Sequence, residues 1–116
     1  MDFFSIFTDP SVYSTNSSGD GYAVISTGKT ALLQLFVTNT TSSIRFVQIF
    51  DSATGPGTHP LLELQLAANT QGTLELLASH WLPLTNGLVV ASSSTAATYT
   101  AGGGTDLYIT AFFIQR

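Results

Sequence analysis

Cysteine is absent from this chain of 116 residues, and basic residues are nearly absent. Without cysteine the chain has no disulfide framework, no thiolate metal site and no thiol nucleophile. Lysine and arginine number three against seven acidic residues, which gives a formal net charge of −4. A protein that neutralises a phosphate backbone needs clustered basic side chains, so we exclude nucleic acid as a direct ligand.

Long apolar runs are missing as well. A membrane-spanning helix needs about 18 or more consecutive apolar residues, and no stretch of the sequence approaches that length. The N-terminus is rich in phenylalanine but carries Asp2 where a signal peptide has basic residues. The sequence therefore predicts a soluble protein that is made in a cytoplasm and has no membrane partner. Its length is that of a single domain with one compact core.

Residues that favour strands are abundant in the chain. Thr, Ser, Val, Ile and aromatic residues dominate, and clusters of Gly and Asn separate short apolar runs. This pattern predicts an all-β fold, a single antiparallel β-sandwich that is jelly-roll-like, with a small barrel as the second choice. The segment 74–84 reads as strand and loop or as a short helix. About eight strands are expected, at residues 21–26, 31–39, 45–51, 61–66, 72–77, 87–93, 96–100 and 106–115.

The chain divides into two parts by composition. Residues 13–116 form the expected sandwich domain, and residues 1–12 form an N-terminal arm. The arm contains Phe3, Phe4, Ile6 and Phe7, which are too many large apolar side chains for a free tail. We predict that it adds to the sheet of a neighbouring subunit or fills its groove. The alternative is that Phe3 and Phe7 pack on the arm's own sandwich.

Two short motifs invite a functional interpretation. The stretch "STGKT", residues 26–30, resembles the end of a phosphate-binding loop, but that loop requires a glycine where this chain has Ala23. A strand-like segment follows Thr30 where the phosphate loop needs a helix, so we predict a hairpin turn. The stretch "DSATGPGTHP", residues 51–60, has turn formers throughout, and only Asp51 and His59 are titratable. We predict an ordered surface loop, which is a good contact surface.

Titratable residues do not form a recognisable catalytic set. A zinc site at His59 or His80 would need a carboxylate such as Asp51 or Glu75 to be brought in by the fold, and no nucleophile elbow accompanies the many serines. Glu63 and Glu75 lie on neighbouring predicted strands and could form a carboxylate pair, but two glutamates on the wet faces of edge strands usually promote solubility. We predict no catalytic residue, no metal, no cofactor and no small-molecule substrate, and therefore a protein that is not an enzyme.

Three segments carry a family resemblance. They are "RFVQIFDSATGPG", "GLVVASSSTAATYT" and "DLYITAFFIQR". Together they resemble the small virion structural proteins of tailed bacteriophages, in a similarity that spans about residues 32–116. The resemblance implies a β-sandwich subunit of the phage particle that decorates or cements the head or belongs to the tail. It implies no catalytic residue, and it implies a location in the virion.

Two functions therefore compete. The first is a capsid decoration or cement protein that binds the major capsid protein or another virion protein through apolar contacts, which agrees with a mean hydropathy of +0.31. The second is a carbohydrate-binding jelly-roll module of a phage fibre or a lectin-like protein. It would use Trp81, Tyr99 or Tyr108 as stacking platforms.

Apolar side chains occupy both faces of the last expected strand, 106–115. A sandwich strand with one face in water alternates with polar residues, so one of these faces needs a protein cover. The resemblance implies a three-fold position on a shell, and we therefore predict a homotrimer to which the loop 51–60 contributes. The predicted interface residues are Phe3, Phe4, Ile6, Phe7, Tyr108, Phe112 and Ile114.

Overall fold

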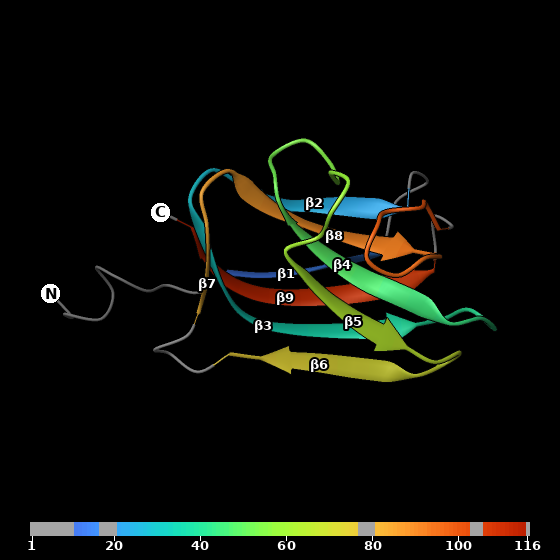
Figure 1. Ribbon diagram of the computed structural model, residues 1–116. Coiled ribbons are helices and arrows are strands. Elements are labelled where there is room, and N and C mark those ends of the chain that lie inside the picture. The colour runs from blue at the N-terminus through green and yellow to red at the C-terminus, as the bar shows by residue number, and fades with distance from the viewer. Residues whose placement is uncertain (1–10, 17–20, 77–80, 103–105, 116) are drawn as a thin grey trace, which may run out of the picture.

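Two antiparallel sheets pack face to face in the computed structural model (Figure 1), which describes residues 11–16, 21–76, 81–102 and 106–115. The predicted all-β sandwich is confirmed. No described residue is helical, so the suggested helix within 74–84 does not form in the described part of that segment. The described residues also contain no helix long and apolar enough to span a membrane.

The first sheet, sheet A, contains five strands. Four of them follow one another in the order β1, β9, β3 and β6, and β7 pairs with the first residues of β3. Their bounds are β1 Ser11–Asn16, β3 Thr30–Asn39, β6 Gln71–Glu75, β7 Leu82–Leu84 and β9 Leu107–Gln115.

The second sheet, sheet B, contains four strands in the order β2, β8, β4 and β5. Among all connections only those from β4 to β5 and from β6 to β7 join strands of one sheet, and every other connection crosses between the sheets. The strand bounds are β2 Tyr22–Thr27, β4 Arg45–Asp51, β5 Leu62–Leu66 and β8 Gly87–Ser93.

The core lies between the sheets and follows from the alternation of side chains along each strand. In sheet A, Leu35 and Val37 of β3 are fully buried against the other sheet, and Ile49 of β4 and Val90 of β8 oppose them from sheet B. All seven residues of β8 are buried, because this central strand is also covered on its outer side. This explains the largely apolar sequence of β8 on both faces.

Three strand predictions need correction. The expected strand at 96–100 is a loop, because its backbone bonds stay local or reach another loop: Ser94 N donates to Thr100 O and Tyr99 N to Thr58 O. Strands β1 and β7 were not predicted. Residues 11 and 12 of the predicted arm belong to β1, and the rest of the arm, residues 1–10, lies outside the described residues.

Candidate interaction surface

The "STGKT" segment is a turn between the two sheets. Gly28 has a φ of 78°, and its N–H donates to Asn86 O at 2.7 Å. Strand β3 starts at Thr30 immediately after it, and Lys29 is exposed. The turn is confirmed, but the predicted hairpin is wrong, because β2 and β3 belong to different sheets and do not pair. No helix N-terminus is present there to hold a phosphate.

Asp51 at the end of β4 holds the turn that connects β7 to β8. Its carboxylate accepts hydrogen bonds from the backbone N–H groups of Thr85 (3.0 Å), Asn86 (2.7 Å) and Gly87 (3.3 Å). Burial raises the pKa of Asp51, but the three backbone donors lower it by more, so this pKa lies below its ordinary value of 3.8. The carboxylate at the start of the "DSATGPGTHP" loop therefore stabilises the turn between β7 and β8.

We expect Asp51 to make the free energy of unfolding depend on pH. Because the folded pKa is lower than the unfolded one, its contribution is present above the unfolded value of 3.8 and is lost as the pH falls through the folded value. Asp51→Asn keeps an acceptor oxygen but cannot titrate. Urea unfolding should find wild type more stable than Asp51→Asn at neutral pH, and this gap should narrow progressively as the pH falls below 3.8. A gap that is unchanged in acid would contradict the role of Asp51.

The two glutamates of the possible acid pair do not meet. Glu63 lies on the outer face of sheet B, opposite Gln48 of β4, whereas Glu75 lies on the outer face of sheet A, opposite Gln34 of β3. The sandwich separates them, so the carboxylate pair is excluded. The interpretation of Glu63 as only a solubility device is also wrong. Glu63 Oε1 accepts hydrogen bonds from Gln48 Nε2 at 2.7 Å and from Ala97 N at 2.9 Å.

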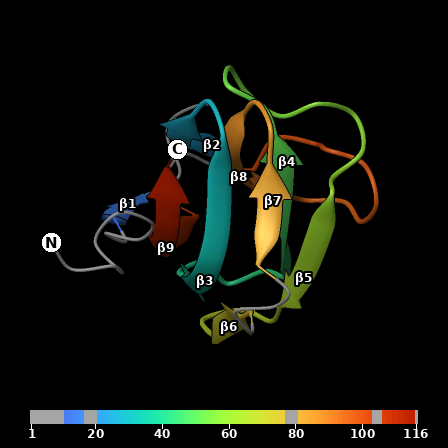
Figure 2. The same cartoon turned by 90° about the vertical axis from the view of Figure 1, so that its left-hand side faces the viewer.

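Two loops, 52–61 and 94–101, form what we call the sheet B cover. Figure 2 shows both on the side of sheet B that faces away from sheet A, in green and orange. Tyr99 of the second loop packs edge-on against Phe50 with ring centroids 6.2 Å apart. Phe50, Val89 and Ala91 are buried beneath this cover. The outer face of sheet B is therefore closed by the chain itself.

Polar side chains hold the sheet B cover in one conformation. The buried Gln48 donates from Nε2 to Thr98 O (3.1 Å), and Ser93 Oγ accepts from Thr95 N (3.2 Å) and Thr100 N (3.0 Å). His59 Nδ1 lies 3.3 Å from Ala97 O, which ties the two loops together. The predicted surface loop at 51–60 is thus ordered by contacts with 94–101.

Glu63 and Glu75 form a matched pair for mutation. Both are exposed on edge strands, but only Glu63 has hydrogen-bond partners among the described residues. We expect Glu63→Ala to lower the free energy of unfolding by about 1.5 kcal/mol, because Ala97 N loses its acceptor and Gln48 Nε2 loses one of its acceptors.

Glu75→Ala should change this free energy by less than about 0.5 kcal/mol. Urea unfolding measures both, and amide hydrogen exchange of residues 94–100 should accelerate only in Glu63→Ala. Equal effects of the two substitutions would show that Glu63 does not hold the cover.

No metal or ligand site emerges from the remaining candidates. The described residues contain no group of three side chains that could bind a metal, and His80 lies outside them. An open pocket of about 190 Å³ lies beside the β2–β3 turn, smaller than the roughly 300 Å³ of ordinary ligand pockets. Lys29 is its only charged residue. The pocket is lined by Lys29, Thr30, Ala31, Pro83, Leu84 and Thr85.

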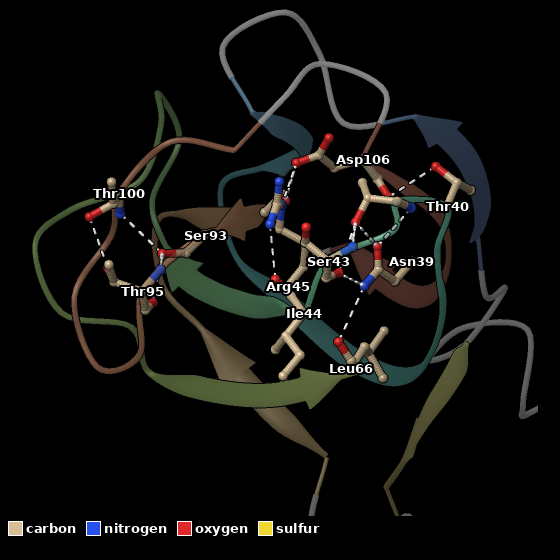
Figure 3. A network of polar contacts seen from close by, with 12 residues as sticks. Asn39, Thr40, Ser43, Ile44, Arg45, Leu66, Ser93, Thr95, Thr100 and Asp106 are labelled. Carbon is tan, nitrogen blue, oxygen red and sulfur yellow. Dashed lines mark hydrogen bonds and ion pairs between the residues drawn. The ribbon is translucent and has the colours of Figure 1, made fainter. Parts of the chain in front are cut away.

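A polar network that the sequence did not predict closes one end of the sandwich (Figure 3). The fully buried Asn39 donates from Nδ2 to the carbonyls of Ser43 (2.8 Å), Leu66 (3.2 Å) and Ala67 (3.1 Å). These bonds tie the loop after β3 to the end of β5, across the two sheets. The only sequence signal was an Asn at the end of an apolar strand, which also fits an ordinary turn residue.

An ion pair belongs to the same end of the molecule. Arg45 Nε lies 2.7 Å from Asp106 Oδ2, and Ser92 Oγ donates to the same oxygen at 3.2 Å. The Asp106 carbonyl accepts from Thr40 N at 2.9 Å. Asp51, Glu63 and Asp106 therefore each hold a segment of the fold, and Glu75 is the remaining carboxylate among the described residues.

The outer face of sheet A is the candidate interaction surface. The register of β1, β9, β3 and β6 places their alternate side chains on this face in three rows that run across the strands, which we call rungs. From β1 to β6, the first rung holds Val12, Phe112, Gln34 and Glu75, and the second Ser14, Thr110, Phe36 and Thr73. The third rung holds Tyr108, Thr38 and Gln71.

Apolar side chains remain accessible on this face. Val12 is 59% exposed and Tyr108 is 47% exposed. Phe112 and Phe36 are half-buried and stack edge to face with ring centroids 5.8 Å apart. The face carries one charged side chain, Glu75, and no basic one. Unlike the outer face of sheet B, it has no cover formed by the two loops (Figure 2).

The structure places only some of the predicted interface residues on an accessible face. Tyr108 and Phe112 lie together on the outer face of sheet A, as the alternation of the last strand predicts. Ile114 is only 5% exposed, so the single chain already buries it and the prediction for this residue needs correction. It lies beyond the bulge of β3, opposite Ala31, which is also buried. Phe3, Phe4, Ile6 and Phe7 lie outside the described residues.

Comparison with known proteins gives no further assignment. No protein-family model matches this chain, and no curated protein matches it in sequence.

Proposed function

We propose that this chain is a structural subunit of a tailed-phage particle, a capsid decoration or cement protein that binds other virion proteins through the outer face of sheet A. The observation that supports this most is the asymmetry of the two outer faces. The loops cover Phe50, Val89 and Ala91 on sheet B and leave Leu61 of the cover exposed, whereas Val12 and Tyr108 are exposed on the strands of sheet A themselves. Accessible apolar patches commonly mark protein interfaces.

The use of the charged side chains also supports a role in assembly. Asp51, Glu63, Arg45 and Asp106 are all engaged in holding loops or strand ends. Acid–base catalysis needs titratable groups that converge on a cleft, and these four side chains are committed elsewhere. We therefore propose a protein without catalytic activity.

We also infer that the sandwich is a jelly roll. Sheet orders β1-β9-β3-β6 and β2-β8-β4-β5, with connections that cross between sheets, support this finer assignment. Jelly rolls occur in viral capsid proteins and in lectins. The fold is thus compatible with the proposed role, and the role itself depends on the face of sheet A.

Mass spectrometry of purified particles of the encoding phage tests this function. The copy number of the chain is counted against the major capsid protein. Many copies, on the scale of the shell lattice, are the expected result. Absence from particles that contain all other structural proteins would contradict the proposal, and a handful of copies would exclude shell decoration in favour of the neck, baseplate or fibre.

We expect the subunit to form a homotrimer. The face that carries Tyr108 and Phe112 and the loop 51–60 lie on opposite sides of the sandwich, so two different patches are available for a closed ring. Each truncation, Tyr108→Ala or Phe112→Ala, should weaken association by about 2 kcal/mol while the fold survives. Sedimentation equilibrium measures this. A wild-type monomer at micromolar concentration, or a stable dimer, would contradict the trimer.

Carbohydrate binding is the second candidate. It is favoured by the accessible Tyr108 ring beside Thr38 and Gln71, which offer uncharged hydrogen-bonding groups. It is weakened because Tyr99 packs on Phe50 over the opposite sheet and shares no face with Tyr108. Binding of the isolated protein to a glycan array, lost in Tyr108→Ala, would favour this candidate over the first.

A further inference from the structure

We propose that the outer face of sheet A binds the N-terminal segment, residues 1–10, of a second copy of this chain. The inference rests on the proposed function, because it takes this face as an assembly surface, and it names the occupant. The occupant of this face is then the segment with four large apolar side chains, and the loop 51–60 contacts the neighbour elsewhere in the ring. The four are Phe3, Phe4, Ile6 and Phe7.

The origin of the segment lies at the same face. Ser11 opens the edge strand β1 and pairs with Phe113 of β9, and the next pair is Val12 with Phe112. The segment therefore starts beside the apolar corner of the face. Ten extended residues reach up to about 33 Å, and four strands about 4.8 Å apart are crossed in about 14 Å. The length of residues 1–10 is sufficient to cross the face of a neighbour and leave several residues as a connection.

The size of the face shows why an additional contact is needed. Three rungs about 6.6 Å apart on four strands give an area on the order of 400 Å². A stable interface of standard size buries about 800 Å² on each partner. Two such faces alone would therefore form a weak contact. An exchanged apolar segment, seated on the face, can add the missing area.

The charges of the two surfaces favour an apolar contact. The face has no basic side chain, and its one carboxylate, Glu75, lies on β6, at the opposite edge from β1. The segment has no basic residue either, and its acidic residues, Asp2 and Asp9, flank the apolar stretch. An ionic attraction is thus excluded. The segment must bind through its aromatic and aliphatic side chains near Val12, Phe112 and Phe36.

Proline at the base of the segment favours a neighbour over the segment's own sheet. Pro10 has no backbone N–H, so it cannot donate a hydrogen bond to a strand of its own sheet. Strand β9, the partner of β1, ends at Gln115, two residues beyond Phe113. A contact in which the segment of one copy meets the face of the next is heterologous. Such contacts close into rings, as a trimer requires.

Disulfide trapping tests the inference, because the chain has no cysteine of its own. Phe7→Cys is mixed with differently tagged Thr110→Cys, whose new thiol lies at the centre of the face, and the mixture is oxidised. Thr98→Cys in the sheet B cover is the matched control. We expect a mixed disulfide with Thr110→Cys in at least 10-fold excess over the control, since the local concentration is raised only at the bound face.

Three results would overturn the inference. The first is equal disulfide formation at Thr110→Cys and Thr98→Cys. The second is a disulfide that forms only within one chain of the Phe7→Cys/Thr110→Cys double variant. The third is a disulfide that forms only between two Phe7→Cys segments. Deletion of residues 2–9 gives an independent measurement. The folded deletion variant should sediment as a monomer. If it still forms the wild-type oligomer, the segment is not the occupant of the face. The proposed function is tested separately, by the presence of the chain in purified particles.

Discussion

Gly87→Ala is expected to lower the free energy of unfolding by about 3 kcal/mol or more. Gly87 has a φ of 154°, which side chains rarely adopt, and a Cβ there would lie 2.5 Å from the carbonyl oxygens of both Ser26 and Ser52. Both obstacles are backbone atoms, of Ser26 in β2 and of Ser52 directly after β4, so they cannot rotate away as a side chain can. Backbone strain and overpacking each cost about 1–3 kcal/mol.

Gly28→Ala is the matched control for this prediction. Gly28 also has a positive φ, 78°, and lies in the neighbouring turn, but nothing is within 4 Å of the position of an added Cβ. Gly28→Ala should lower the free energy of unfolding only by the cost of placing alanine at a positive φ, about 1 kcal/mol. Urea unfolding of the two variants measures the difference. Equal losses would mean that the close approach of Gly87 to Ser26 and Ser52 does not limit this site.

Asn39→Ala is the second substitution with a large expected effect. It removes the donor for the carbonyls of Ser43, Leu66 and Ala67 and the acceptor for Thr41 N, in a side chain that is fully buried. Buried polar groups without partners cost about 1–3 kcal/mol each. We expect the free energy of unfolding to fall by about 3 kcal/mol.

Asn39→Asp separates the donor role from side-chain shape. An aspartate keeps the acceptor for Thr41 but places a carboxylate against three carbonyl oxygens. It should destabilise at least as much as alanine at neutral pH. Gln71→Ala, at an exposed position of β6, is the control and should cost less than about 0.5 kcal/mol. A nearly neutral Asn39→Asp would contradict the network of Figure 3.

Strands with sustained alternation were the predictable part of this fold. β3, β4, β8 and β9 contain long runs of β-branched, aromatic and leucine residues, and their structural bounds agree with the expected ranges within one residue. β1 escaped prediction because Val12 and Tyr13 are its only large apolar residues. β7 escaped because it has three residues and includes Pro83.

The incorrect strand at 96–100 has a physical reason. The sequence "AATYT" alternates small and larger residues as a strand does, but Ala97 has a φ of 66°, which breaks an extended course. Gln48 and Glu63 on other strands fix the loop, and such long-range partners cannot be inferred from local sequence. The same limit hid the roles of Asn39 and Asp106, whose partners are distant in the chain.

The candidate surface was predictable only in part. Alternation along the last strand correctly grouped Tyr108 with Phe112 and separated them from the core residues Ile109 and Phe113. It could not show that the β3 bulge and the buried Ala31 end the accessible face before Ile114. Nor could it show that the chain covers its other outer face with its own loops, which is the asymmetry on which the proposed function rests.

Incorporation of a folded Tyr108→Ala/Phe112→Ala double variant into phage particles tests the central claim most directly. Mass spectrometry compares its copy number with that of the wild type, after urea unfolding has shown that the variant is folded. Each central aromatic contact is worth about 2 kcal/mol, or about 30-fold in binding, so loss of both predicts a decrease on the order of 1,000-fold. Incorporation of the folded double variant at the wild-type copy number would contradict assembly through the outer face of sheet A.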